Sequence, residues 1–327
     1  MIGRRDFIKL LGGAAALPLP ARAQQPQLPV IGWLDPRSPD TNLDSQRAFL
    51  RGLMETGYSE GENVTIVHRW AENQLDRLPV MAAELVRRRV AVIVTSGGRL
   101  AHYAAKAATK DIPIVFHTAE DPVRAGLVTS FARPSGNLTG VTFLTFELLA
   151  KRLELLHEMV PGASRIAVLV NPMNPENAAT LQDAEMAARS LGLQLQIRKA
   201  RNSGEIDETF AALALDRPDA LFVDGDSFYA SRRVQLVHLA TFHKLPASYS
   251  LREFPEVGGL MSYGSDTQAT YRQVGAYVGR ILKGAKPADL PVVQSSKFEL
   301  ALNHQTARML KLEIPAKLLT IADVVIE

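Results

Sequence analysis

Residue types able to perform chemistry occur in the chain, but their spacing does not suit a catalytic or metal site. Residues 57–61 read Gly-Tyr-Ser-Glu-Gly, which matches the Gly-x-Ser-x-Gly pattern of a hydrolase nucleophile. That pattern needs a strand before it and a helix after it, whereas this segment follows an expected helix, so we interpret it as a turn. His157-Glu158 lacks the second histidine of a zinc-binding helix, and His238 and His243 are five positions apart, off a common helical face.

The remaining metal and cofactor signals are equally incomplete. Asp224-Gly225-Asp226 lacks the other ligands of a calcium loop. The chain has no cysteine, which excludes disulfides, Cys-ligated zinc and iron–sulfur clusters. We therefore expect a protein that is not an enzyme and holds no cofactor and no metal.

Apolar runs of strand length alternate with amphipathic helical stretches, and the series occurs twice. In the first half we expect strands at 29–34, 63–70, 90–95, 113–117 and 137–143, with helices at 45–56, 75–88 and 100–109. In the second half we expect strands at 165–170, 193–199, 220–224 and 246–249, with helices at 148–159, 178–191, 206–213 and 232–243. This alternation predicts an α/β fold of two Rossmann-like lobes, each with a parallel central sheet.

The last third of the chain departs from a simple order in which one lobe follows the other along the sequence. Strands are expected at 258–263 and 297–303, with a helix at 267–282 between them. The final strand has a neighbour only if the chain passes between the lobes again. We therefore expect a hinge made of several crossovers.

The residues directly after the expected strands are the candidates for binding a ligand. In open parallel sheets, ligands bind beyond the carboxyl ends of the strands, where loops and helix N-termini present unpaired donors. Two such edges facing each other would form a cleft. The candidates are Asp35, Ser96, Gly97, Thr118 and Asp121 in the first lobe, and Asn171, Asp226, Tyr249, Ser250 and Tyr263 in the second.

In the first lobe, the small residues Ser96-Gly97-Gly98 favour an anion site. They would let backbone amides and a hydroxyl approach a carboxylate at the start of the next helix. The alternative is an ordinary strand-to-helix turn. Together with Thr118, Ser96 is our candidate for binding a ligand carboxylate.

Carboxylates and aromatic rings are the other candidates. Asp121 and Asp226 would hold a ligand amino group, or would cap the helices that follow them. Asn171 precedes a proline, which favours an extended backbone at this residue, and its amide both donates and accepts. Tyr249 and Tyr263, with Phe143, would stack on a planar ligand, or pack in the core. In our prediction, Asn171, Tyr249 and Tyr263 complete the second wall of the cleft.

The first 23 residues read as an export signal. A twin arginine at Arg4-Arg5 precedes the apolar stretch 10–19, and the small residues Ala21 and Ala23 precede Gln24. An uncleaved anchor is the alternative, but about 20 apolar residues are needed to span a bilayer and this run is shorter. We predict a twin-arginine signal peptide over 1–23, cleavage near Ala23 and a periplasmic protein.

The net charge and the length of the chain bear on its partners and on the number of its lobes. Cleavage removes four of the 37 basic and one of the 34 acidic residues, leaving 33 of each. With no net positive charge, nucleic acid is not an expected partner. The remaining 304 of 327 residues exceed what one core usually organises, which again favours two lobes. We expect a monomer.

Several ordered motifs carry a resemblance to a known family. They include Asp121-Pro-Val-Arg-Ala-Gly-Leu-Val, Arg133-Pro-Ser-Gly-Asn-Leu-Thr-Gly-Val, Lys151-Arg-Leu-Glu-Leu-Leu, Arg252-Glu-Phe, Gly258-Gly-Leu-Met-Ser-Tyr-Gly and Ile281-Leu-Lys-Gly-Ala-Lys-Pro-Ala-Asp-Leu-Pro. The chain resembles, over nearly its whole length after the signal, the ABC-transporter substrate-binding family that includes tryptophan- and tyrosine-type binding proteins.

The resemblance implies the type I periplasmic binding protein fold, with two lobes closing around a solute. We expect residues 24–142 plus 262–292 in the N-terminal lobe, and 143–261 plus 293–327 in the C-terminal lobe. The implied function is capture of a small organic solute, an amino acid or a related aromatic or aliphatic acid, and its delivery to an ABC permease in the inner membrane. The alternatives are an exported sensing subunit for a membrane receptor and an exported α/β enzyme.

Overall fold

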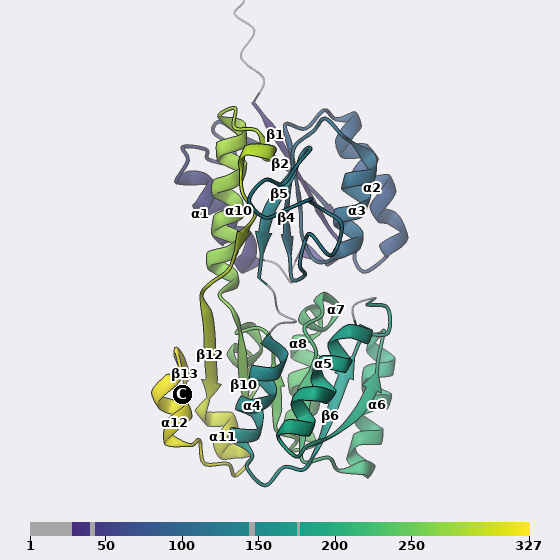
Figure 1. Cartoon of the computed structure of the whole chain (residues 1–327), viewed down its shortest axis with the longest axis vertical. Coiled ribbons are helices and arrows are strands. Elements are labelled where there is room, and N and C mark those ends of the chain that lie inside the picture. The colour runs from purple at the N-terminus through teal and green to yellow at the C-terminus, as the bar shows by residue number, and fades with distance from the viewer. Residues whose placement is uncertain (1–27, 40–42, 144–147, 175–176) are drawn as a thin grey trace, which may run out of the picture.

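The computed structural model describes residues 28–39, 43–143, 148–174 and 177–327, which form two stacked α/β lobes (Figure 1). The signal expected at 1–23 lies outside the described residues. None of the described helices has the length and apolar character that crossing a membrane requires.

The first lobe is built on a six-stranded sheet, all of whose pairs are parallel. Its strand order is β11-β5-β4-β3-β1-β2. The strands are β1 Val30–Asp35, β2 Thr65–Trp70, β3 Val92–Thr95, β4 Ile114–Thr118, β5 Leu138–Thr142 and β11 Val293–Gln294. The helices are α1 Leu43–Met54, α2 Leu78–Arg87, α3 Arg99–Ala108 and α10 Thr267–Leu282.

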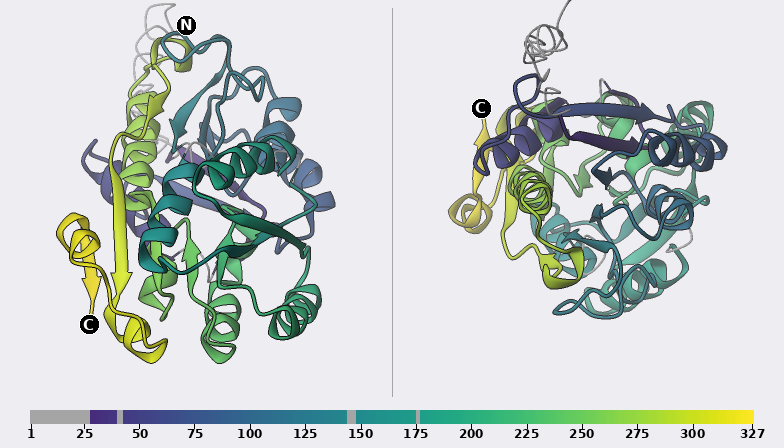
Figure 2. Two further views of the ribbon diagram at one scale, coloured as in Figure 1. Left: turned by 60° about the horizontal axis from the view of Figure 1, so that its bottom comes forward. Right: turned by 90° about the horizontal axis from the view of Figure 1, so that it is seen from above.

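Helices cover both faces of this sheet, as the alternation in β1 shows. Ile31 and Trp33 pack under α1 and α10, whereas Leu34 packs under α2 and α3. Because successive strand residues point to opposite faces, a strand buried on both faces is apolar throughout. The view from above in Figure 2 shows α1 and α10 side by side on one face.

The second lobe is built on a seven-stranded sheet with the order β13-β12-β10-β9-β8-β6-β7. Its strands are β6 Arg165–Val170, β7 Gln194–Lys199, β8 Ala220–Val223, β9 Ala247–Tyr249, β10 Met261–Ser265, β12 Phe298–Asn303 and β13 Val324–Ile326. Its helices are α4 Leu149–Met159, α5 Asn177–Ser190, α6 Ser203–Asp216, α7 Ser227–Ser231, α8 Arg233–Phe242, α9 Glu253–Glu256, α11 His304–Met309 and α12 Ala316–Ile321. The expected fold class of two parallel-dominated α/β lobes is confirmed, with one exception inside this sheet: β10 and β12 are antiparallel.

The described chain passes between the two lobes three times. The second and third of these crossovers lie a few residues later than we expected. Residues 262–265 belong to β10 in the second sheet, not to the first lobe, and β11 at Val293–Gln294 pairs with β5 in the first sheet. Each of these crossovers follows a strand that is paired within the lobe the chain is leaving, β10 with β9 and β12, and β11 with β5. The paired strands are distant in the sequence, so the local pattern did not show which lobe holds these residues.

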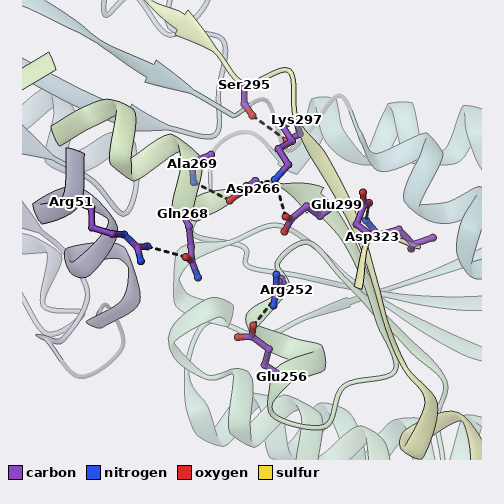
Figure 3. A network of polar contacts seen from close by, with 11 residues as sticks. Arg51, Arg252, Glu256, Asp266, Gln268, Ala269, Ser295, Lys297, Glu299 and Asp323 are labelled. Carbon is purple, nitrogen blue, oxygen red and sulfur yellow. Dashed lines mark hydrogen bonds and ion pairs between the residues drawn. The ribbon is translucent and has the colours of Figure 1, made fainter. Parts of the chain in front are cut away.

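The crossing segments bond to one another, and together they form the hinge (Figure 3). Lys297 Nζ lies 2.8 Å from Asp266 Oδ2 and 3.4 Å from Glu299 Oε1. Asp266 N donates to the carbonyl of Lys297 at 3.2 Å, and Ser265 Oγ donates to the carbonyl of Phe143 at 2.8 Å. All three crossovers are therefore joined at one place.

Candidate ligand-binding site

A cavity of about 520 Å³ lies between the lobes, at the carboxyl ends of the strands of both sheets. This volume falls within the range of small-molecule sites, about 300–1,000 Å³. Six of the ten candidates that we named for binding a ligand line it, namely Ser96, Gly97, Thr118, Asn171, Asp226 and Ser250. Phe143 lines it as well.

The other four candidates do not line this cavity, and one of them, Asp35, is bonded to Arg37. Asp121 caps the turn after it, accepting from Val123 N at 2.7 Å and Arg124 N at 3.1 Å. Tyr249 is fully buried with its ring stacked 4.4 Å from that of Phe254, and Tyr263 packs against the core of the second lobe.

Strand alternation explains the position of Tyr249. Adjacent strand residues point to opposite faces. Tyr249 ends β9 with its side chain in the core, while the next residue, Ser250, lies at the cavity. The sequence showed which residues follow the strands but not which of two neighbours faces the cleft.

A buried ion pair supports the wall of the first lobe. The Arg37 guanidinium binds both oxygens of Asp35, Nε to Oδ1 at 2.9 Å and Nη2 to Oδ2 at 2.8 Å. The same Nη2 donates to Ser96 Oγ at 3.1 Å and to Tyr271 OH at 3.0 Å. The Ser96 hydroxyl, which we expected to bind a ligand carboxylate, is fully buried and already bonded to Tyr271. These bonds fix the position of the Ser96 hydroxyl in the wall, and its binding of a ligand carboxylate stays a prediction.

Three rings form a stacked group beside this ion pair. The ring of His117 lies 4.0 Å from that of Tyr271 and 4.5 Å from that of Phe143, and all three residues line the cavity. Burial, with Arg37 close by, holds the pKa of His117 well below its ordinary value. The imidazole is therefore neutral near pH 7, which suits a face against an apolar or aromatic group. We call these three residues the aromatic shelf.

Helix α3 begins at the cavity without a side-chain cap. Its cap residue is Gly98, with φ of 131°, preceded by Gly97 with φ of 78°. A Cβ at Gly97 would lie 2.6 Å from Asp35 Oδ1, so the turn requires glycine on both grounds. A helix start of this kind attracts a negative charge.

The two lobes approach each other closely at this turn. A Cβ built on Gly98 would lie 3.8 Å from Ser227 Oγ, on the first residue of α7 in the second lobe. The structure therefore has the lobes close together around the cavity.

In the second lobe, Asp226 is both a cap and a cavity residue. Its Oδ1 accepts from Asn171 Nδ2 at 3.0 Å and from Phe228 N at 2.9 Å, and its Oδ2 accepts from Asn174 Nδ2 at 3.4 Å. Burial raises the pKa of Asp226, and these hydrogen bonds oppose that rise. Asp226 therefore caps α7 and also lines the cavity, and its binding of a ligand amino group stays a prediction.

Several cavity residues were not predicted from the sequence. Glu120 is paired with Arg99 at 2.7 Å, and Glu253 accepts from Thr267 Oγ1 at 3.0 Å. Glu253 lies in the Arg252-Glu-Phe motif, which was the available signal for it. Among the described residues, no group of three or more His, Asp or Glu side chains is placed to hold a metal ion.

The fold and cavity are those of a two-lobed solute-binding protein of the type I periplasmic binding class. The family model for ABC transporter substrate binding proteins matches residues 36–326, so the chain belongs to that family. It is a substrate-binding protein and not an enzyme, which agrees with our interpretation of residues 57–61 as a turn.

Individual relatives agree with this assignment. The tyrosine-binding protein of Clostridioides difficile strain R20291 is 26% identical over 270 residues, covering 82% of this chain and 77% of the relative. The crystal structure of a conserved domain protein from Vibrio cholerae has a TM-score of 0.83 at 26% identity, covering 91% of this chain and all of the other. An ABC domain from Streptococcus pneumoniae, crystallised with L-Trp, has a TM-score of 0.83 at 27% identity with the same coverage.

Proposed function

We propose that the protein captures an α-amino acid in the cavity between its lobes and delivers it to an ABC permease of the inner membrane. The observation that carries this proposal is the composition of the cavity. An uncapped helix start in one lobe faces buried carboxylates in the other, and an aromatic shelf lies beside them. An α-amino acid has the matching groups, which are a carboxylate, an ammonium and an apolar side chain.

The start of α3 is the proposed carboxylate site. Backbone amides at Gly97 and Gly98 approach the cavity without side chains in the way, and the helix dipole adds to the attraction. The Arg37 charge is already compensated by Asp35. This proposal assigns the carboxylate to the backbone amides of the next two residues, Gly97 and Gly98, in place of the Ser96 hydroxyl.

The aromatic shelf favours a solute with an aromatic side chain. Offset or tilted ring contacts add about 0.5–1.5 kcal/mol beyond the area buried. The names of two relatives, one a tyrosine-binding protein and one crystallised with L-Trp, support the same class of solute. We propose tyrosine, tryptophan or a closely related aromatic acid as the solute.

The proposed place of action is the periplasm, reached after cleavage of the twin-arginine signal near Ala23. N-terminal sequencing of the exported protein tests this directly, and a new N-terminus at Gln24 is the expected result. Export that continues when Arg4 and Arg5 are both replaced by lysine would contradict the twin-arginine route.

Calorimetry with an amino-acid panel tests the binding function. Protein comprising residues 24–327 is unfolded, freed of any small molecule by dialysis, refolded and titrated with each standard amino acid. We expect saturable 1:1 heat with at least one aromatic amino acid, and native mass spectrometry of untreated protein should show the same mass added.

The control is L-tyrosine amide, which lacks the carboxylate and should bind at least tenfold more weakly if the α3 start holds that group. The binding function is wrong if no amino acid gives saturable heat. Uptake of the bound amino acid by vesicles that contain the permease would distinguish transport from sensing.

A further inference from the structure

The cavity presents two carboxylates of the second lobe, and their surroundings differ. Asp226 has both oxygens bonded to protein amides, as described above. Glu253 has one oxygen engaged, because Oε1 accepts from Thr267 Oγ1 at 3.0 Å. Its Oε2 is buried and has no hydrogen-bond partner among the described residues.

A buried carboxylate oxygen without a hydrogen-bond donor bears the full desolvation penalty, and a larger one when it is charged. Among the described residues, Glu158, Asp224 and Glu253 each have such an oxygen, and of these three only Glu253 lines the cavity. A functional role is one explanation for such a group in a native structure. Oε2 of Glu253 therefore indicates a missing cationic or donor group at the cavity.

Glu253 also occupies a particular place between the lobes. It begins α9 in the second lobe and lines both the main cavity and a smaller pocket of about 320 Å³ at the hinge. Its partner Thr267 is the first residue of α10 in the first lobe. The Glu253–Thr267 hydrogen bond thus joins the two lobes directly beside the ligand cavity.

The cations around the hinge pocket are already engaged. Arg252 binds Glu256 at 2.8 Å, and Lys297 binds Asp266 and Glu299 (Figure 3). Among the described residues, neither cation is hydrogen-bonded or ion-paired to Glu253. The hinge network therefore leaves the second oxygen of Glu253 uncompensated.

Of the cations that line the main cavity, Arg233 acts on Glu253 only at a distance. Its Nη1 donates to the carbonyl of Ala230 at 3.3 Å. Burial raises the pKa of Glu253, hydrogen bonds from its own backbone amide and from Thr267 oppose that rise, Glu256 adds to it, and Arg233 lowers it. The charged groups that face Glu253 are Arg252 and Glu256 on its own segment, Arg233 on α8, Asp44 on α1, Asp266 before α10, and Lys297 and Glu299 at β12.

We propose that Glu253 Oε2 accepts a hydrogen bond from the ammonium group of the bound solute. Glu253, rather than Asp226, is then the residue that selects for a cationic nitrogen. This inference rests on the proposed amino-acid function. Because Oε1 is bonded to α10 of the other lobe, recognition of the ammonium is coupled to the arrangement in which the lobes are close together.

The proposal predicts a proton linkage of definite sign. The ligand ammonium favours the charged form of Glu253, whose pKa is raised in the ligand-free protein. Affinity should therefore fall as the pH is lowered through that raised pKa, and binding should release up to one proton in the same range.

Calorimetry of E253Q and the matched variant E256Q tests the proposal. The probes are L-tryptophan and L-tyrosine, each with its N-acetyl derivative, which keeps the carboxylate and ring but has no ammonium. We expect E253Q to bind the free amino acids about 10- to 100-fold more weakly than wild type. E256Q should bind like wild type, since Glu256 lines only the hinge pocket.

Two further readouts separate recognition of the ammonium from a structural role. The preference for the free amino acid over its N-acetyl derivative should disappear in E253Q and persist in D226N. Titrations in buffers of different ionisation enthalpy, from about pH 4.5 to 7, should show proton release in wild type and none in E253Q. If E253Q unfolds, E253D, which keeps the charge, should retain both the proton release and the preference.

The outcomes distinguish the two proposals. If wild-type protein binds no amino acid, the proposed function fails and this inference fails with it. If wild type binds a probe but E253Q binds it equally well, or if D226N rather than E253Q loses the preference for the free amine, only the role of Glu253 is wrong.

Discussion

The Asp35–Arg37 pair shows how single residues prepare the binding surface. Asp35 is completely buried at the end of β1, and Arg37, two residues later, turns back to bind it while also bonding to Ser96 and Tyr271. One cation therefore holds together the end of β1, the turn before α3 and the second turn of α10.

Replacing Asp35 by asparagine tests this role. Arg37 would remain buried without its counter-charge, so we expect the free energy of unfolding to fall by about 3–5 kcal/mol. Chemical denaturation measures the change. The control is Glu154→Gln, which breaks an exposed pair with Lys151 and should cost less than about 1 kcal/mol. Equal effects of the two variants would show that the buried pair has no special role.

The aromatic shelf makes a separate prediction about selectivity. Phe143→Ala removes one ring of the shelf, so binding of an aromatic amino acid should weaken about two- to tenfold, in line with the energy of one ring contact. Binding of an aliphatic amino acid should change less. Calorimetry compares the two solutes, with Val234→Ala on the exposed surface as the control. A uniform loss for both solutes would contradict stacking.

At the scale of elements, helix α10 connects the hinge to the binding site. It begins at the second crossover, presents Tyr271 to the cavity and packs along α1. The packing is unusually close at two glycines: a Cβ at Gly275 would lie 2.1 Å from the carbonyl oxygen of Phe49, and one at Gly52 would lie 1.8 Å from that of Arg272. The glycines set the distance between the two helices and therefore the position of Tyr271.

Gly275→Ala should force the two helices apart. Overpacking of this kind costs about 1–3 kcal/mol, partly offset by the better helix propensity of alanine. We expect a lower Tm and weaker amino-acid binding in the same variant, because Tyr271 would move with α10. The control is Gly162→Ala, where no atom lies within 4 Å of the added Cβ. A Tm unchanged from wild type would show that the helix pair can relax.

At the scale of the whole molecule, three crossovers that bond to one another connect the lobes. Ser265 bonds to Phe143, and Lys297 bonds to Asp266 (Figure 3). Across the cleft, the turn at Gly98 lies close to α7, and Thr267 bonds to Glu253. Ligand contacts that both lobes make only when close together would favour the closed population.

Small-angle X-ray scattering tests closure. The radius of gyration should decrease when a solute identified by calorimetry is added to saturation, and the scattering of the bound form should match the present structure. E256Q should behave in the same way. No change in scattering at a concentration where calorimetry shows full occupancy would contradict hinge closure.

Local sequence patterns were enough to predict the two lobes, the repeated crossing and most of the strand ends. The apolar runs, the small residues at 96–98 and the aspartate before α7 depend on neighbours close in the chain, and such neighbours determine strands, turns and caps. The resemblance to the family then connected these elements to a cleft.

Only the tertiary structure decided which side chains form the site. Tyr271 and Arg37 meet across 234 positions of sequence, and Glu253 meets Thr267 only because the chain returns to the first lobe. Tyr249 faces the core and Ser250 the cavity because strand pairing determines the face on which each residue lies. Local pattern determines an element, but the contacts between elements depend on how lobes and sheets are assembled, and that is a long-range property of the folded chain.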